Sequence, residues 1–254
     1  MKNFTNRYML LYSLGIAAVV AVVLSVVALS LKTRQDANIR NEKMQMLLAT
    51  IGVECSRDDA ANQYPAYFKE ELTVSTDGKV VTRYIIATGE FAVKNGDTRA
   101  FDIKLKEEQA KENSGGKGEF PVYVYEKDGE QGYVIPTQGN GLWGAVYANI
   151  ALADDLSTIV GITFSHDSET PGLGAEIAGE AFRNQFVGKQ ILDGEGTVVS
   201  VAVVKHADAS DAHQVDAISG GTMTSNGVSD MLLADLKRYQ SFITTTRKEA
   251  RDEQ

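Results

Sequence analysis

The chain has 254 residues, of which 43% are apolar, and this composition is typical of folded domains. It carries 25 basic and 34 acidic residues, a net charge of −9, which argues against nucleic acid as a partner because phosphate binding needs a basic face. Cys55 is the only cysteine, so neither a disulfide nor a cysteine-based metal or iron–sulfur site can be built from this chain alone.

A long apolar segment near the N-terminus predicts a membrane anchor. Residues 8–31 contain no charge, and as a helix they would extend about 36 Å, enough to cross a hydrocarbon core about 30 Å thick with some tilt. A cleaved signal peptide is the alternative, but its apolar region is usually about 7–15 residues long and no small-residue cleavage site follows here. Because basic residues lie on both sides of the segment, the positive-inside rule does not decide the topology. They are Lys2 and Arg7 before it and Lys32, Arg34, Arg40 and Lys43 after it.

The chain after this segment is expected to form a helical stalk and a folded domain. Residues 33–50 contain no Gly or Pro and place apolar side chains among charges, a pattern that suits a helix continuing out of the membrane. We expect the N-terminus and transmembrane helix over residues 1–31, a juxtamembrane stalk over 32–60, the folded domain over 61–245 and a charged tail over 246–254. Without its first 31 residues the chain has a net charge of −11, so the folded part is acidic.

Short alternating or β-branched runs predict a sheet in the folded domain, with turns at Asp77-Gly78, Asn95-Gly96 and Asp128-Gly129. The expected strands cover residues 79–88, 100–105, 121–126, 133–136, 144–152, 157–165 and 197–205. Helices are expected over 175–185 and 225–244, and the apolar side chains of the latter fall at helical spacing, as in a helix that packs on a sheet. The sum is an α+β fold.

The stretch SGGTMTS, residues 219–225, lies between a β-branched run and the last expected helix. It predicts the start of that helix, with Thr224 or Ser225 as the N-cap. The first amides of a helix have no partner within the helix, which makes such a start a natural anion site. Read alone, however, the stretch favours an ordinary capped turn, because short motifs match readily by chance.

Two glycines and one lysine make phosphate the anion to consider. Gly220 and Gly221 would let the backbone take left-handed conformations and let a phosphate approach closely. Lys205 would come near from the preceding strand. In an acidic domain this would be a local phosphate cradle.

Two further stretches are rich in turn residues: GNGLWG at 139–144 and HDSETPGLGAEI at 166–177. Taken alone, Trp143 favours a core anchor and Pro171-Gly172 a plain turn. His166 has no matching cluster of histidines or carboxylates in the sequence, so we predict no metal site and no nucleophilic triad.

These stretches together resemble a known family. The pattern D-x-x-S-G-[AG]-T-x-[TS] at residues 216–224 is similar to the flavinylation motif of FMN-binding domains, in which the last threonine of S-G-A-T carries FMN through a phosphoester bond. ETPGLG at 169–174 resembles a flavin-facing loop of the same domains. G-x-G-L-W at 139–143 points more narrowly to the C subunit of the sodium-translocating NADH:quinone oxidoreductase (Nqr), because the related G subunit of the Rnf complex lacks the GLW tract. Gly221 stands where the family usually has alanine.

The resemblance implies a set of site residues. Thr222 would be the covalent attachment point, its hydroxyl oxygen replacing one phosphate oxygen of FMN. The nearby motif residues would surround the phosphate, with Asp216 acting during attachment because the family's flavin transferase is magnesium-dependent. These phosphate-side residues are Ser219, Gly220, Gly221, Thr224, Asp216 and Lys205. The candidates for the isoalloxazine pocket are Thr170, Leu173, Leu142 and Trp143.

The resemblance also implies a function. The chain would be a membrane-anchored electron carrier with covalent FMN in Nqr. Its partners would be the other membrane and flavin subunits and, during maturation, the flavin transferase. The protein would lie in the cell inner membrane with residues 32–254 on the periplasmic side. An FMN subunit of an Rnf-type ferredoxin:NAD oxidoreductase, or a membrane-anchored binding or assembly module without flavin, are the alternatives. The single apolar segment has no interior carboxylate, so it offers no ion pathway.

Overall fold

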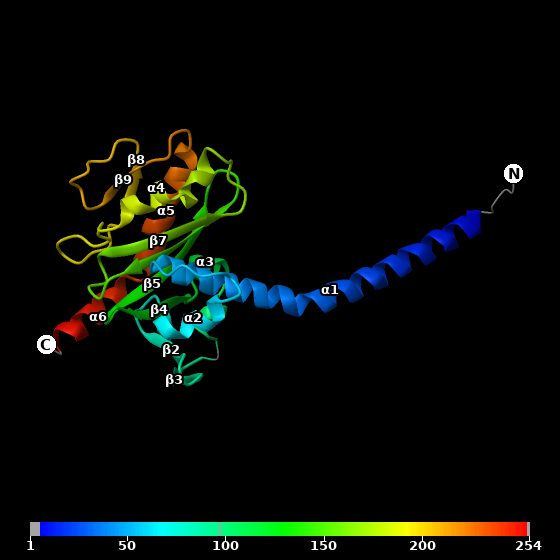
Figure 1. The fold of residues 1–254 in the computed structure, drawn as a ribbon, viewed down its shortest axis with the longest axis horizontal. Helices are drawn as coiled ribbons and strands as arrows, with labels where there is room; N and C mark the ends of the chain where they lie inside the picture. The colour runs from blue at the N-terminus through cyan, green and yellow to red at the C-terminus, as the bar shows by residue number, and fades with distance from the viewer. Residues whose placement is uncertain (1–5, 97, 253–254) are drawn as a thin grey trace.

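A seven-stranded antiparallel sheet forms the centre of the folded part in the computed structural model, which describes residues 6–96 and 98–252 (Figure 1). The strand order is β3-β2-β1-β4-β5-β6-β7, and a small parallel pair, β8 and β9, lies outside it. The strands are β1 (Phe68–Ser75), β2 (Val80–Ile85), β3 (Glu90–Lys94), β4 (Glu119–Lys127), β5 (Glu130–Asn140), β6 (Ala145–Leu152), β7 (Ile159–His166), β8 (Ala202–Val204) and β9 (Gln214–Asp216).

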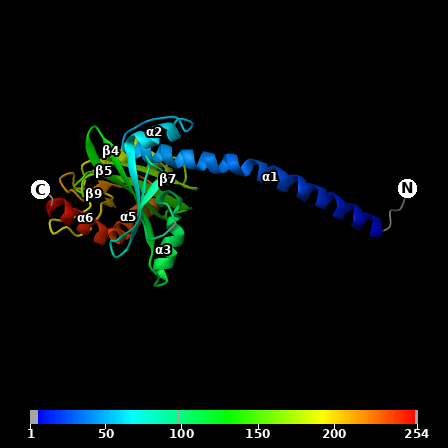
Figure 2. The same ribbon diagram turned by 90° about the horizontal axis from the view of Figure 1, so that it is seen from below.

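Helices cover both faces of this sheet. Seen from below, α1 and α2 lie on one side of the strands and α5 and α6 on the other (Figure 2). The α-helices are α1 (Asn6–Thr50), α2 (Ala60–Tyr67), α3 (Leu105–Asn113), α4 (Glu180–Arg183), α5 (Thr222–Arg238) and α6 (Gln240–Asp252). Short 3₁₀ helices are η1 (Ala100–Asp102), η2 (Gly174–Ala178) and η3 (Asn184–Phe186). The predicted α+β fold is confirmed.

Two hydrophobic cores result from the alternation of side chains along the strands. In β4, Val122 and Val124 face the core under α5 and α6, whereas Tyr123 and Tyr125 face a second core. The second core includes Leu47 and Leu48 from the last turns of α1, together with residues of α2 and η1. The sheet therefore buries both of its faces, and the folded part includes the end of the N-terminal helix.

Helix α1 continues without a break from the apolar segment into this second core. Its side chains are exposed from residue 6 to residue 40, and within the described residues it is the one helix long and apolar enough to cross a membrane. The helix ends at Thr50, and turns occupy most of the remaining predicted stalk before α2 begins at Ala60. The apolar half of α1 has no protein core to pack against, which is what a membrane anchor requires.

The strand predicted over residues 100–105 is wrong. Ala100–Asp102 forms η1, and α3 begins at Leu105. Ala100 and Phe101 are both buried in the second core, and two consecutive side chains on one side do not fit a strand, whose side chains alternate. The strand predicted over 197–205 is reduced to β8, and β1, β3, β9, α2 and α3 were not predicted.

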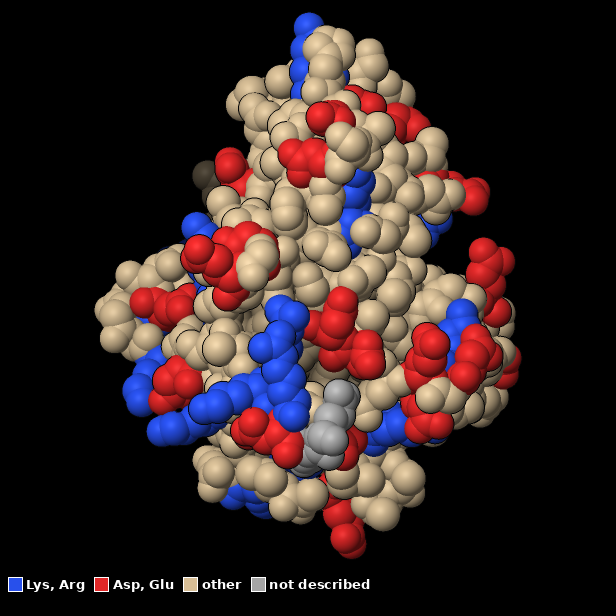
Figure 3. Space-filling model, turned by 90° about the vertical axis from the view of Figure 1, so that its left-hand side faces the viewer, with Lys and Arg blue, Asp and Glu red and all other residues tan. Residues whose placement is uncertain are grey.

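The two predicted helices also differ from those observed. The one over 175–185 is divided into η2, α4 and η3, and the one over 225–244 begins earlier, at Thr222, and is interrupted at Tyr239. Tyr239 is fully buried, and its hydroxyl donates to the carbonyl of Pro121 at 3.1 Å. Anchoring this side chain inside the domain redirects the chain into α6, which ends at the face away from α1. Acidic and basic side chains are interspersed on that face (Figure 3).

Candidate functional site

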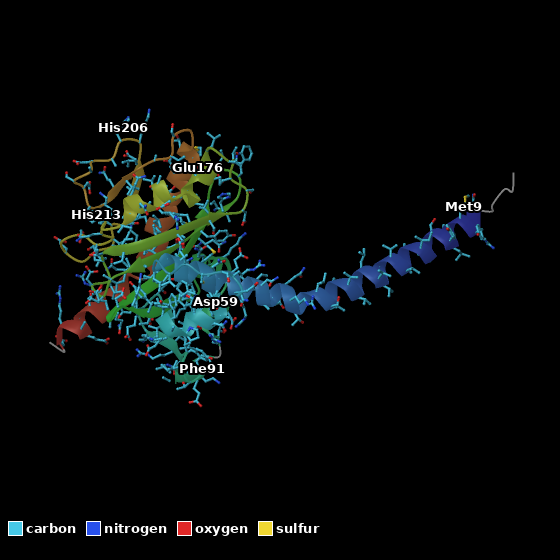
Figure 4. All side chains as sticks on the ribbon, viewed as in Figure 1. Met9, Asp59, Phe91, Glu176, His206 and His213 are labelled. Atoms are coloured by element: carbon cyan, nitrogen blue, oxygen red, sulfur yellow. The ribbon has the colours of Figure 1, made fainter. Side chains whose placement is uncertain are left out.

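Three segments that are distant in the sequence meet at the N-terminal end of α5. They are residues 140–144 after β5, residues 167–174 after β7, and residues 217–221 before α5. In Figure 1 the start of α5 (orange) lies beside the yellow-green segment that leads into η2, and Figure 4 labels Glu176 on η2. The structure therefore brings the three sequence motifs together.

Glu169 joins these segments. Its side chain is only 4% exposed, and its Oε2 accepts a hydrogen bond from the Thr224 hydroxyl at 2.5 Å, while Oε1 accepts one from the Trp143 amide at 2.8 Å. Burial raises the pKa of Glu169, but the hydrogen bonds from Thr224 and from the amides of residues 142–144 outweigh burial and hold this pKa below its ordinary value. Glu169 is therefore a carboxylate at neutral pH. Glu169 is the first residue of the ETPGLG stretch, but no local pattern in the sequence indicates a role for it.

The predicted N-caps of α5 are wrong. Gly221 occupies the N-cap position and no side chain caps the helix. Thr224 and Ser225 are buried in the first turn, where Thr224 donates to Glu169 and the Ser225 Oγ accepts the Ile218 amide at 3.1 Å. A hydroxyl has one proton to donate, and in this structure the Thr224 hydroxyl donates it to Glu169.

Thr222 is the first residue of α5, and its side chain is exposed. The first backbone hydrogen bond of the helix runs from the Ser225 amide to the Gly221 carbonyl at 2.8 Å. The amides of Thr222 and Met223 precede that bond, and helix geometry leaves them without an intrahelical acceptor. The hydroxyl of Thr222 thus lies in the open beside amides that suit an anion.

The two glycines before Thr222 differ in conformation. Gly220 has φ +75°, so the predicted left-handed backbone is confirmed there, and a Cβ at this position would lie 2.6 Å from Cδ2 of Leu173. Gly221 has φ −108°, which any residue can adopt, so the same prediction is wrong for Gly221. The close approach of Leu173 to Gly220 places the ETPGLG loop directly against the turn before α5.

Replacing Gly221 by alanine is expected to lower the free energy of unfolding by about 1 kcal/mol, because alanine is a poorer N-cap than glycine and its Cβ would lie 3.0 Å from Cβ and Cγ2 of Ile218. Thermal unfolding of the two proteins measures this. Gly194→Ala is the matched control, since a Cβ there meets nothing within 4 Å. Equal stability of Gly221→Ala and the natural chain would mean that Ile218 moves aside without cost.

Lys205 and Asp216 lie at the neighbouring ends of β8 and β9. Val204 pairs with Asp216, and the Ala217 amide donates to the Val204 carbonyl at 2.7 Å. Lys205 is exposed, and its side chain has no hydrogen bond or ion pair within the described part of the chain. The Asp216 carboxylate accepts the Ala207 amide at 2.9 Å. Asp216 therefore stabilises the β8–β9 connection, and Lys205 is free to approach an anion.

An apolar rim of exposed side chains lies on the segments that meet at the start of α5. It is formed by Leu142, Trp143, Leu173 and Met223, whose exposed fractions are 50%, 67%, 43% and 60%. Trp143 is therefore not a core anchor. Thr170 is exposed in the same loop as Leu173. Exposed apolar clusters mark binding surfaces.

None of the motif residues lines the cleft of about 950 Å³ between β1, β2 and α6. The Nδ1 atom of His166 accepts a hydrogen bond from the Glu169 amide at 3.3 Å, so this atom is already in use within the loop. The geometry suits a flat, partly apolar group with an anionic end.

Comparison with known proteins agrees with this geometry. Residues 141–237, which include the three segments except for Asn140, match the FMN-binding domain family. The C subunit of the Na(+)-translocating NADH-quinone reductase of Vibrio parahaemolyticus is 32% identical over 234 residues, covering 88% of each chain. The corresponding C subunit of Neisseria meningitidis serogroup B is 30% identical over 223 residues, covering 86% of this chain and 85% of that one.

Solved structures have the same fold. The crystal structure of the Na(+)-translocating NADH-quinone reductase C subunit from Parabacteroides distasonis superposes with a TM-score of 0.72 and 36% identity, covering 84% of this chain and 97% of that one. Shewanella oneidensis NqrC, at 23% identity, shares the fold with a TM-score of 0.65, covering 82% and 98% of the two chains. This chain belongs to the family of C subunits of the Na(+)-translocating NADH-quinone reductases.

Proposed function

We propose that this chain is the membrane-anchored electron-transfer subunit of a sodium-translocating NADH:quinone oxidoreductase and carries FMN covalently on Thr222. The observation that supports this most directly is the meeting of three motifs around the exposed Thr222 hydroxyl at the start of α5. The names of the relatives indicate which complex the chain would belong to. Those relatives offer no support for an Rnf-type complex.

The start of α5 fits the phosphate end of FMN. The Thr222 oxygen would replace one phosphate oxygen, leaving a diester with a single negative charge beside the uncapped amides of the helix. Gly220 keeps the turn free of a side chain, and the exposed Ser219 and Lys205 are within the same surface region of the motif. No acid–base pair is needed to hold a group that is already bonded.

The apolar rim fits the ring. Bound FMN supplies one-electron chemistry, while the protein fixes its orientation and its exposure. Leu142, Trp143 and Leu173 offer apolar contacts, and Thr170 offers a hydroxyl at the edge. Because the rim side chains are 43–67% exposed, the rim would retain a free flavin only weakly. A covalent bond therefore has a physical purpose in this structure.

The attachment is tested by intact mass. Coexpression of the full chain with a flavin transferase is expected to add the mass of one FMN less one water, and the protein should appear as an ultraviolet-fluorescent band on a denaturing gel. Chain expressed without the transferase is the control. A protein that stays at its unmodified mass under coexpression would overturn the proposal and favour a binding or assembly module without flavin.

We further propose that residues 8–31 cross the inner membrane and that the folded domain lies in the periplasm. The support is the exposed apolar half of α1 together with the family resemblance. Protease added to intact spheroplasts is expected to digest the folded domain. Full protection in spheroplasts, with digestion only in inverted vesicles, would reverse the orientation.

A further inference from the structure

Glu169 differs from the other buried carboxylates of the described residues. Three are buried: Glu71, Asp235 and Glu169. Arg99 pairs with Glu71, and Arg238 pairs with Asp235. Within the part of the chain that the structure describes, no Lys, Arg or His forms an ion pair with Glu169. Its charge is balanced only by a hydroxyl, by backbone amides and by the start of α5.

An unpaired buried charge is costly, so a fold keeps it where hydrogen bonds support it. Those bonds connect Glu169 to both halves of the proposed flavin site. Thr224 is two residues after Thr222 on α5, and Trp143 belongs to the apolar rim. Glu169 also directly precedes Thr170, in the loop whose Leu173 lies against Gly220. One side chain thus fixes the attachment helix relative to both ring-contacting loops.

We propose that Glu169 is the positioning residue of the flavin site and holds the start of α5 against the two loops. Its negative charge, which no ion pair neutralises among the described residues, disfavours the reduced flavin. This rests on the proposed function. Reduction adds electrons to the flavin, and a nearby negative charge in a poorly solvated place raises the energy of the electron-rich form. The expected consequence is a lower reduction potential than a neutral side chain would give.

The positioning role of Glu169 is tested on the full-length chain without flavin, in detergent. Trp143 is the only tryptophan, so its fluorescence reports on the loop bonded to Glu169. Lowering the pH is expected to change this emission in one step below the ordinary carboxyl range, as Glu169 is protonated. Because the Thr224 hydroxyl helps to lower the pKa of Glu169, Thr224→Val is expected to move the step to higher pH. Glu169→Gln is expected to remove it.

The effect of the Glu169 charge on the reduction potential is tested on flavinylated protein. In Glu169→Gln the amide oxygen can still accept from Trp143 and the amide nitrogen can donate to the Thr224 oxygen, so covalent FMN should be retained while its midpoint potential becomes more positive. Glu176→Gln is the matched control. Glu176 is an exposed carboxylate of the same region that accepts the Gly172 amide at 3.0 Å, and among the described residues it forms no hydrogen bond with Thr224 or Trp143. Water screens its charge, so its replacement is expected to leave the potential unchanged.

The outcomes separate the proposals. A fluorescence step that persists unchanged in Glu169→Gln overturns the positioning role, whether or not any flavin is attached. A potential that is equal in Glu169→Gln and the natural chain, or an equal shift in Glu176→Gln, overturns the charge effect. Failure to attach FMN to the natural chain defeats the proposed function alone, because the fluorescence titration needs no flavin.

Discussion

Replacement of Thr222 by alanine is expected to abolish covalent FMN completely. Alanine has no side-chain oxygen and so cannot form the phosphoester bond. The fold should be unaffected, since Thr222 is exposed at the first position of α5 and the first turn is held by Thr224 and Ser225. Surface substitutions of this kind change stability by about 0.5 kcal/mol or less. Intact mass and gel fluorescence after coexpression with the transferase measure the loss.

Two hydroxyl controls make this result specific. Thr222→Ser keeps an oxygen at the same place and is expected to retain at least part of the modification. Ser219→Ala removes a neighbouring exposed hydroxyl and is expected to remain flavinylated. Fluorescence that survives in Thr222→Ala but disappears in Ser219→Ala would move the attachment point three residues upstream.

Replacement of Arg99 by methionine is expected to reduce the free energy of unfolding by roughly 3–5 kcal/mol, because it leaves a buried carboxylate unpaired. Glu71 is fully buried on β1, and Arg99 donates to its two oxygens, from Nη2 at 2.6 Å and from Nε at 3.1 Å. For a domain of this size the loss corresponds to a fall in melting temperature of about 6–20 °C. Thermal unfolding of the full chain in detergent measures it.

A second ion pair of the same sheet provides the control. Arg83 lies 3.4 Å from Glu70, but both side chains reach solvent, so Arg83→Met is expected to cost less than about 1 kcal/mol. The double variant Glu71→Gln with Arg99→Met removes the buried charge along with its partner and should recover much of the lost stability. An Arg99→Met protein with the same melting temperature as the natural chain would contradict the claim that Glu71 depends on Arg99.

Local patterns in the sequence predicted most of the sheet and the long helix. Strands β4, β6 and β7 follow β-branched or alternating runs, and the uncharged residues 8–31 form part of α1 as expected. The pattern failed where burial is set by tertiary contact. Ala100 and Phe101 read as part of a strand, yet both enter the second core beneath α1. No neighbouring residue in the sequence indicates that α1 packs against these two side chains.

The candidate site divides in the same way. Gly220 was predicted from its motif, because the demand for a left-handed backbone is local. The role of Glu169 depends on Thr224, which is 55 residues further along the chain, and on the Trp143 amide. A carboxylate at the start of a turn-rich loop resembles many others on the surface. Only the packing of three loops reveals that it is buried and that the Thr224 hydroxyl is already in use.

Because α1 is one continuous helix, its apolar half and the folded domain are expected to move together. The helix has 45 residues, a length of about 68 Å, and its last turns are fixed in the folded domain, so there is no joint at which the domain could swivel alone. With residues 8–31 in a bilayer, as proposed, each 10° of helix tilt would move the end of α1, about 30 Å beyond residue 31, through about 5 Å. Tilt responds to the match between apolar length and lipid thickness. The thickness of the surrounding membrane would thereby affect the position of the proposed flavin site.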